Sequence, residues 1–119
     1  MSSQQPINQL ISQQNYQEAR EACENAINAN PEDIYPCFYL GLVYLLQGEV
    51  EEAQGVWIWA MLESPSELDG DQRNEALIAI LQTQAQKETE QENWRNSQLI
   101  YEQLQELVPN DINTLLTLV

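Results

Sequence analysis

The segment from Cys37 to Pro65 reads CFYLGLVYLLQGEVEEAQGVWIWAMLESP, two apolar stretches around one glycine at position 48. Gly48 predicts a tight turn between two helices, and Pro65 predicts the end of the second. Small and large residues share one face of each expected helix: Leu40, Gly41 and Tyr44 on the first, and Ala53, Trp57 and Ala60 on the second. Small residues fall where two helices would touch and large ones beside them. The segment therefore predicts a packed antiparallel helical pair.

The preceding segment repeats this pattern at a spacing of 34 residues. The aligned positions are Ala19 with Ala53, Cys23 with Trp57, Ala26 with Ala60, and Pro31 with Pro65. A two-helix unit of about 34 residues resembles the tetratricopeptide repeat. The resemblance implies stacked helical pairs that bind proteins or peptides rather than catalyse reactions.

A third unit is longer. Its final proline, Pro109, follows Pro65 by 44 residues, so we place the additional residues in 66–78. The second helix of this unit again shows helical spacing, with Trp94, Ser97, Tyr101 and Leu104 at the aligned positions. Asp71 is a suitable N-cap for the preceding helix, which we expect from about Asp71 to Glu90, with Ala85 in place of the repeat glycine.

We expect one all-α domain, a right-handed α-solenoid of stacked antiparallel helix pairs. Its expected parts are repeat 1 (about 1–31), repeat 2 (about 32–65), a lengthened repeat 3 (about 66–109) and the start of a further helix (111–119). That last segment is apolar, whereas the ends of repeat stacks are usually polar. We therefore expect the chain to be a fragment of a longer protein.

Charge restricts the partners. The net charge is −15, with only four basic residues, Arg20, Arg73, Lys87 and Arg95. Nucleic-acid and anionic membrane binding both depend on basic side chains, so neither is expected. A protein or peptide of apolar or basic character is favoured, and the absence of a signal-like or spanning segment predicts a cytoplasmic protein.

Catalytic chemistry has little support. The chain contains no histidine, the commonest general base and transition-metal ligand near neutral pH. No carboxylate pair stands out as an acid and a base, and Glu67, Asp69 and Asp71 lack the spacing of a calcium loop. We expect no enzyme activity, no cofactor and no metal. Cys23 and Cys37 are expected to be buried free thiols, with a disulfide as the alternative, and Trp57 and Trp94 to be core residues.

The candidate binding surface is the concave face of the stack. By its resemblance to the repeat, the strip there comprises Tyr35, Phe38, Leu42 and Leu45, with Asn8 from the first repeat. Such an apolar strip would hold a helix or an extended peptide. The alternative is that the lengthened helix 71–90, or a further repeat, covers it. Asn8 alone fits a carboxylate clamp, which otherwise requires Lys or Arg.

Three functions remain open. The first is a protein-interaction scaffold that binds through the concave face. The second is a recruiting or dimerising arm of a larger bacterial transferase. For this hypothesis, the sequence YLGLVYLLQG at 39–48, EAQGVW at 52–57 and PNDINTLL at 109–116 also resembles the region preceding the catalytic domain of glycosyltransferases like the protein O-GlcNAc transferase (SPINDLY type) and of some methyltransferases. The third is a homodimer formed through the C-terminal helix.

Overall fold

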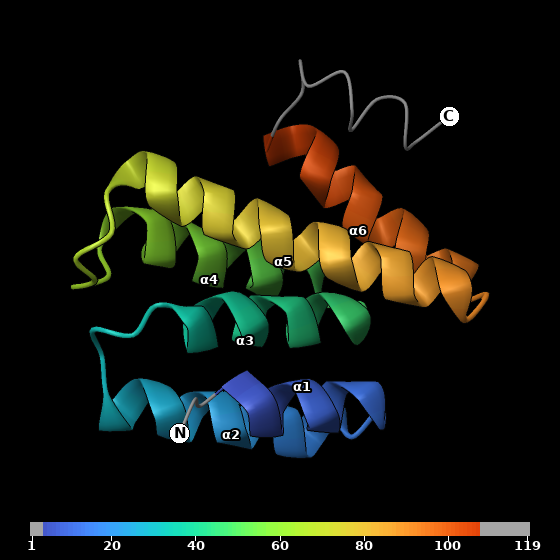
Figure 1. Ribbon diagram of the computed structural model, residues 1–119, viewed down its shortest axis with the longest axis horizontal. Helices are drawn as coiled ribbons and strands as arrows, with labels where there is room; N and C mark the ends of the chain where they lie inside the picture. Colours follow the sequence, from blue (N-terminus) through green and yellow to red (C-terminus); the bar gives the residue numbers. More distant parts are fainter. Residues whose placement is uncertain (1–3, 108–119) are drawn as a thin grey trace. The chain divides into compact units, whose positions relative to one another are not determined.

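The structure, a computed structural model, describes residues 4–107 as helices joined by short turns, with no strand in that range (Figure 1). The helices are α1 (Gln4–Ser12), α2 (Tyr16–Ala29), α3 (Tyr35–Leu46), α4 (Val50–Leu62), α5 (Gly70–Glu90) and α6 (Trp94–Leu107). The all-α prediction is confirmed. The predicted start of a helix at 111–119, together with Pro109, lies outside the described residues.

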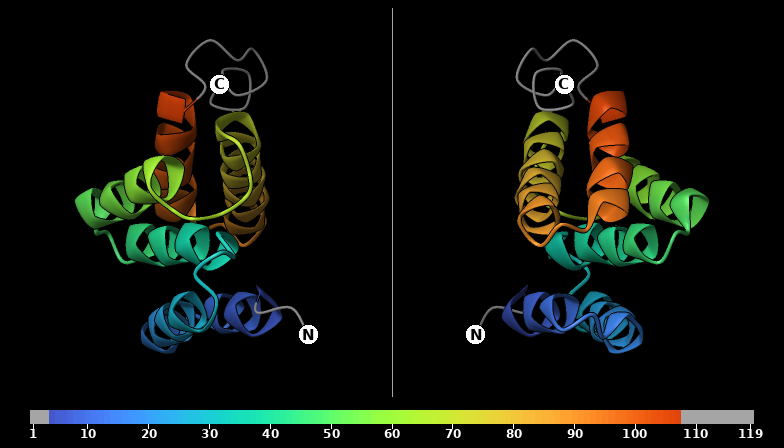
Figure 2. Two further views of the ribbon diagram at one scale, coloured as in Figure 1. Left: turned by 90° about the vertical axis from the view of Figure 1, so that its left-hand side faces the viewer. Right: turned by 90° about the vertical axis from the view of Figure 1, so that its right-hand side faces the viewer.

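The chain divides into two compact units, residues 1–70 and residues 71–119. In the first unit α1 pairs with α2 and α3 pairs with α4, and α3 also contacts both helices of the preceding pair (Figure 2). In the second unit α5 and α6 are antiparallel and joined by a short turn. None of the helices in the described part of the chain has the length and apolar character needed to cross a bilayer.

Helix α5 corresponds to the lengthened helix that the sequence predicts. α5 ends at Glu90 as predicted but begins at Gly70, so Asp71 lies in its first turn rather than at the N-cap. A carboxylate in the first turn is favourable because it faces the positive end of the helix dipole.

The prediction that Trp94 is a core residue is wrong: this side chain is 62% exposed at the start of α6. The polar residues around it place it on the outside of the helix.

The pair α3–α4 is held by close contact between Gly41 and Trp57. A Cβ atom at position 41 would overlap the Trp57 indole ring, so only glycine fits there. The indole Nε1–H donates a hydrogen bond to the Phe38 carbonyl at 3.1 Å. Trp57 is 5% exposed, and Ala53 and Ala60, one turn before and after it, have no exposed area. The repeat signature thus corresponds to an indole whose N–H edge is packed against a helix backbone.

Each helical pair turns through the same hydrogen-bonded motif. After α3, Gly48 adopts a φ of 83°, and its N–H and that of Glu49 donate to the Leu45 and Tyr44 carbonyls, both at 2.9 Å. These two bonds define a Schellman ending. The same bonds follow α1, from Gln14 to Ile11 and Asn15 to Leu10, and α5, from Glu92 to Thr89 and Asn93 to Glu88. Gln14 and Glu92 therefore hold positive φ values of 61° and 63° without being glycine.

Replacing Gly41 by alanine is expected to lower the free energy of unfolding by about 1–3 kcal/mol, because the added methyl group displaces the indole. Urea unfolding followed by circular dichroism measures this loss. Gly55→Ala in α4 is the matched control, since a Cβ there meets no atom within 4 Å. The control should instead gain about 0.5–1 kcal/mol from helix propensity. Equal effects of the two substitutions would contradict the assigned role of Gly41.

Replacing Gln14 by glycine is expected to raise the free energy of unfolding by about 1 kcal/mol, since a side chain at positive φ is strained. Gln13→Gly is the control because position 13 has no positive φ; it should lower stability through backbone entropy and through loss of the exposed hydrogen bond that the Asn15 side chain donates to Gln13. A loss for Gln14→Gly as large as that for Gln13→Gly would mean that the turn does not have the described geometry.

Candidate functional site

The strip predicted from the sequence is largely core in the structure. Phe38, Leu42 and Leu45 have no exposed area, and Tyr35 and Asn8 are half-buried. The Tyr35 and Phe38 rings meet edge to face, with centroids 6.2 Å apart. Three of the five predicted residues therefore present no surface to a partner in this structure, and the role of the strip in binding stays a prediction.

An apolar hollow of about 520 Å³ lies in the first unit between α2, α3 and α4, and we call it the α2–α4 groove. Its lining residues are Ile27 from α2, Cys37, Leu40 and Tyr44 from α3, and Glu52, Gly55, Val56 and Trp59 from α4. Only Glu52 among them is charged. The groove has the size and apolar lining typical of binding pockets.

The groove and the predicted strip use different faces of α3. Successive helical residues are turned by about 100°. Cys37, Leu40 and Tyr44 therefore form one stripe, and Phe38, Leu42 and Leu45 form another, roughly on the opposite side. The groove is thus a separate surface from the strip that the repeat resemblance indicates.

The outer side of α4 extends this apolar surface. Ile58 is 59% exposed, Trp59 40% and Leu62 77%. Apolar residues lie on all sides of α4, a pattern expected of a helix covered all round. Contiguous exposed apolar side chains on a protein surface usually mark a contact site. This surface was not predicted as a binding site from the sequence, although Ile58, Trp59 and Leu62 lie outside the stripe that packs on α3 and were the available signal.

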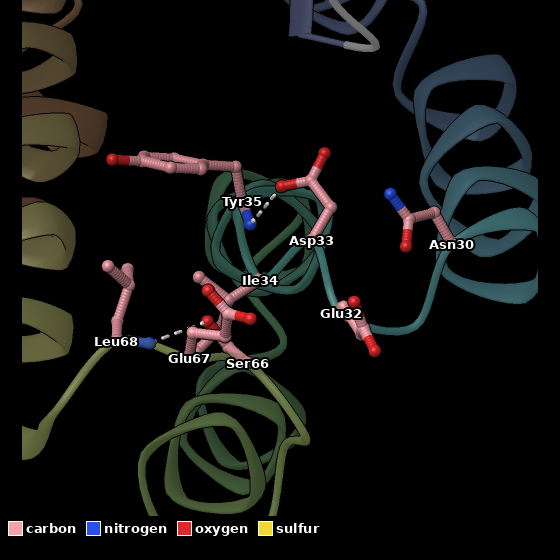
Figure 3. Close-up of a pocket in the computed structure, with 8 residues that line it drawn as sticks. All are labelled: Asn30, Glu32, Asp33, Ile34, Tyr35, Ser66, Glu67 and Leu68. Atoms are coloured by element: carbon pink, nitrogen blue, oxygen red, sulfur yellow. Dashed lines mark hydrogen bonds between the residues drawn. The ribbon is translucent and has the colours of Figure 1, made fainter.

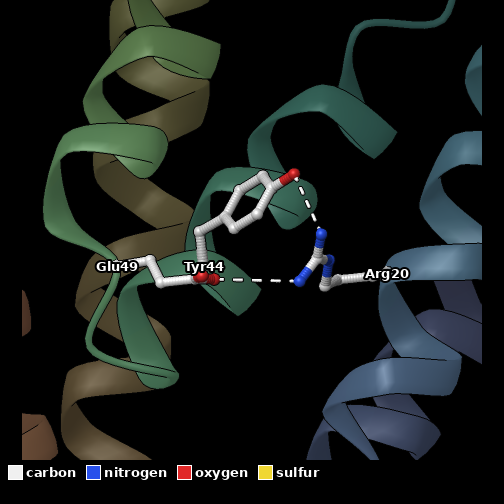
Figure 4. A network of polar contacts seen from close by, with 3 residues as sticks. All are labelled: Arg20, Tyr44 and Glu49. Carbon is white, nitrogen blue, oxygen red and sulfur yellow. Dashed lines mark hydrogen bonds and ion pairs between the residues drawn. The ribbon is translucent and has the colours of Figure 1, made fainter.

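One end of the groove is fixed by Arg20, which links the two repeats (Figure 4). Its guanidinium lies 4.6 Å from the centre of the Tyr44 ring. It donates to the Tyr44 hydroxyl at 3.4 Å and lies 3.8 Å from the Glu49 carboxylate. Stacking of this kind contributes about 0.5–1 kcal/mol at partly exposed sites. The network orients Tyr44, whose ring lines the groove.

A second, polar hollow of about 310 Å³ lies between the loops that follow α2 and α4 (Figure 3). Glu32, Asp33 and Glu67 contribute carboxylates to its lining. One Asp33 oxygen accepts the Tyr35 backbone N–H at 3.2 Å, at the start of α3. These carboxylates are not arranged as a metal site: in the described part of the chain, no three or more cysteine, aspartate or glutamate side chains are placed so that they could hold a metal ion together. We interpret this hollow as the acidic edge of the repeat loops.

Cys23 and Cys37 are free, buried thiols, as expected. Burial is the main cause that raises the pKa of Cys23 to about 12, helped by the neighbouring Cys37 and Glu24. Burial, followed by the charge of Asp33, also raises the pKa of Cys37. Reaction of either thiol requires its thiolate, so both are unreactive near neutral pH.

The raised pKa of Cys23 predicts how stability depends on pH. Between its ordinary pKa of 9.0 and about 12, the unfolded chain loses a proton that the native chain keeps, so stability falls as pH rises. The loss through Cys23 is about 1 kcal/mol at one pH unit above the ordinary pKa. Urea unfolding on both sides of that pKa should show a smaller decrease for Cys23→Ala than for the parent. Equal decreases would contradict the buried thiol, since the parent and the variant differ only at position 23.

The geometry above defines a protein built from stacked helical pairs with a repeated turn. Residues 10–56, which include α2 and α3, match the model of a family described as Tetratricopeptide repeat. This region is therefore similar to the tetratricopeptide repeat, and the described residues, 4–107, form an all-α helical repeat fold. Searches of curated proteins and of solved structures returned no match for the chain.

Proposed function

We propose that this protein is an interaction module that binds a protein or peptide partner in the α2–α4 groove. Repeats of this family generally mediate protein–protein contacts. The carrying observation is the apolar lining of the groove, continued by the exposed Ile58, Trp59 and Leu62 on α4. Burial of such a surface by a partner is the main source of favourable binding energy.

The concave strip is the second candidate surface for the same function. Only Tyr35 and Asn8 among its predicted residues have exposed area in the structure. Binding at the buried Phe38, Leu42 and Leu45 would require these side chains to be uncovered. We therefore propose the groove as the principal binding surface and the strip as the second candidate. The larger transferase and the cytoplasmic location stay predictions from the sequence.

The experiment is site-specific photo-crosslinking in cells that express the protein. A photoreactive phenylalanine analogue replaces Glu52 in the groove, Tyr35 on the strip, or Gln17 on the exposed side of α2. We expect a discrete protein adduct from position 52 and none from position 17. The adduct should disappear when Trp59→Ala is added, because the exposed indole contributes contact area that alanine cannot replace.

Two outcomes would contradict the proposal. An adduct from position 35 alone would move binding to the strip and leave the interaction function intact. No adduct from either position 35 or position 52, or equal labelling from position 17, would remove the interaction function itself. Circular dichroism of each variant establishes that it is folded before the comparison is made.

A further inference from the structure

We propose that the occupant of the α2–α4 groove is an amphipathic helix of a partner protein, with apolar residues on one face and lysine or arginine beside them. This inference rests on the proposed function and assigns the chemistry of the partner. It is carried by the shape of the groove, by Gly55 and by the charge around the groove.

The shape of the groove fits a short helix. Its lining comes from Ile27 of α2, from four residues of α4, and from three residues of α3, the helix that lies between α2 and α4 in the chain. The lining residues of α4 run from Glu52 to Trp59, a distance of about 11 Å along the helix axis. A partner helix would place about two of its turns in the groove and present apolar side chains at i, i+3, i+4 and i+7.

Gly55 indicates close approach of a partner backbone. Glycine inside a helix costs about 1 kcal/mol relative to alanine. Packing within the chain does not require this glycine, because a Cβ at position 55 would meet no described atom within 4 Å. Gly55 lines the groove beside Val56 and Trp59. A small residue at that place lets a second helix lie close against α4.

The charge around the groove selects a cationic partner. Residues 1–70 contain a single basic residue, Arg20, whose guanidinium is engaged by Tyr44 and Glu49. The same residues contain eleven acidic ones: Glu18, Glu21, Glu24, Glu32, Asp33, Glu49, Glu51, Glu52, Glu63, Glu67 and Asp69. Glu52 lines the groove, and Glu24 and Glu63 are exposed one turn from the lining residues Ile27 and Trp59. Lysines or arginines flanking an apolar face would meet these carboxylates.

Charge also argues against a second copy of this chain as the occupant. Each copy has a net charge of −15, and like charges across an interface oppose association. A basic segment gains both faster encounter and a complementary rim from the same field. We therefore choose a cationic helix over self-association.

The test uses a phage-displayed library of helices of about 14 residues, which have leucines at the apolar positions and either lysine or glutamate at each flanking position. The purified chain is the bait. We expect lysine-rich sequences to be enriched about tenfold or more over glutamate-rich ones, with the preference reduced at high salt. Trp59→Ala and Gly55→Leu should each abolish the enrichment. Trp94→Ala is the matched control, because Trp94 is exposed on α6 outside the groove, and should leave it unchanged.

The inference would be overturned by no enrichment, by no preference for lysine, or by enrichment that survives Trp59→Ala. A dimer in sedimentation that Trp59→Ala dissociates would replace the cationic helix by a second copy. The photo-crosslinking experiment tests the proposed function separately from this choice of partner. A photo-adduct from position 52 together with no lysine preference would keep the interaction function and reject only this choice of partner. The mapped adduct peptide should itself be basic and amphipathic.

Discussion

The packing of the Trp57 ring against the backbone at Gly41 is the contact on which the first unit depends. It sets the distance between α3 and α4, and the indole N–H bond to the Phe38 carbonyl fixes the rotation of the ring. Because α3 also contacts α1 and α2, a displacement of α3 would propagate to the neighbouring pair. Most lining residues of the α2–α4 groove belong to these two helices, so the groove depends on the same contact.

The fold was predictable because the sequence repeats the determinants of this contact. The aligned positions are occupied by Ile7 and Cys23 in α1 and α2, by Gly41 and Trp57 in α3 and α4, and by Ala85 and Tyr101 in α5 and α6. Where one member of the pair is smaller, the other is larger, as expected for close packing at constant volume. The Schellman turns at Gln14 and Glu92 were not predicted, because neither residue is a glycine and only the backbone hydrogen bonds reveal them.

The binding surface was harder to predict for a physical reason. Periodicity tells which side chains share a face of a helix, but it does not tell which face remains uncovered after packing. Phe38, Leu42 and Leu45 form a regular stripe on α3 and are nonetheless fully buried. Ile58 and Leu62, on the outer side of α4, are exposed. Exposure depends on contacts between distant residues, and the sequence pattern of a single helix does not contain them. Trp94 was misplaced for the same reason.

The central claim is that Gly41 is required because of the Trp57 ring. A double-mutant cycle tests it directly: Gly41→Ala is introduced into the parent and into a Trp57→Leu background, and the free energies of unfolding are compared. If the claim is correct, the cost of Gly41→Ala in the parent disappears or becomes a gain of about 1 kcal/mol in the background without the indole, where helix propensity alone acts. The same cost in both backgrounds would show that the glycine is needed for another reason and would contradict the account.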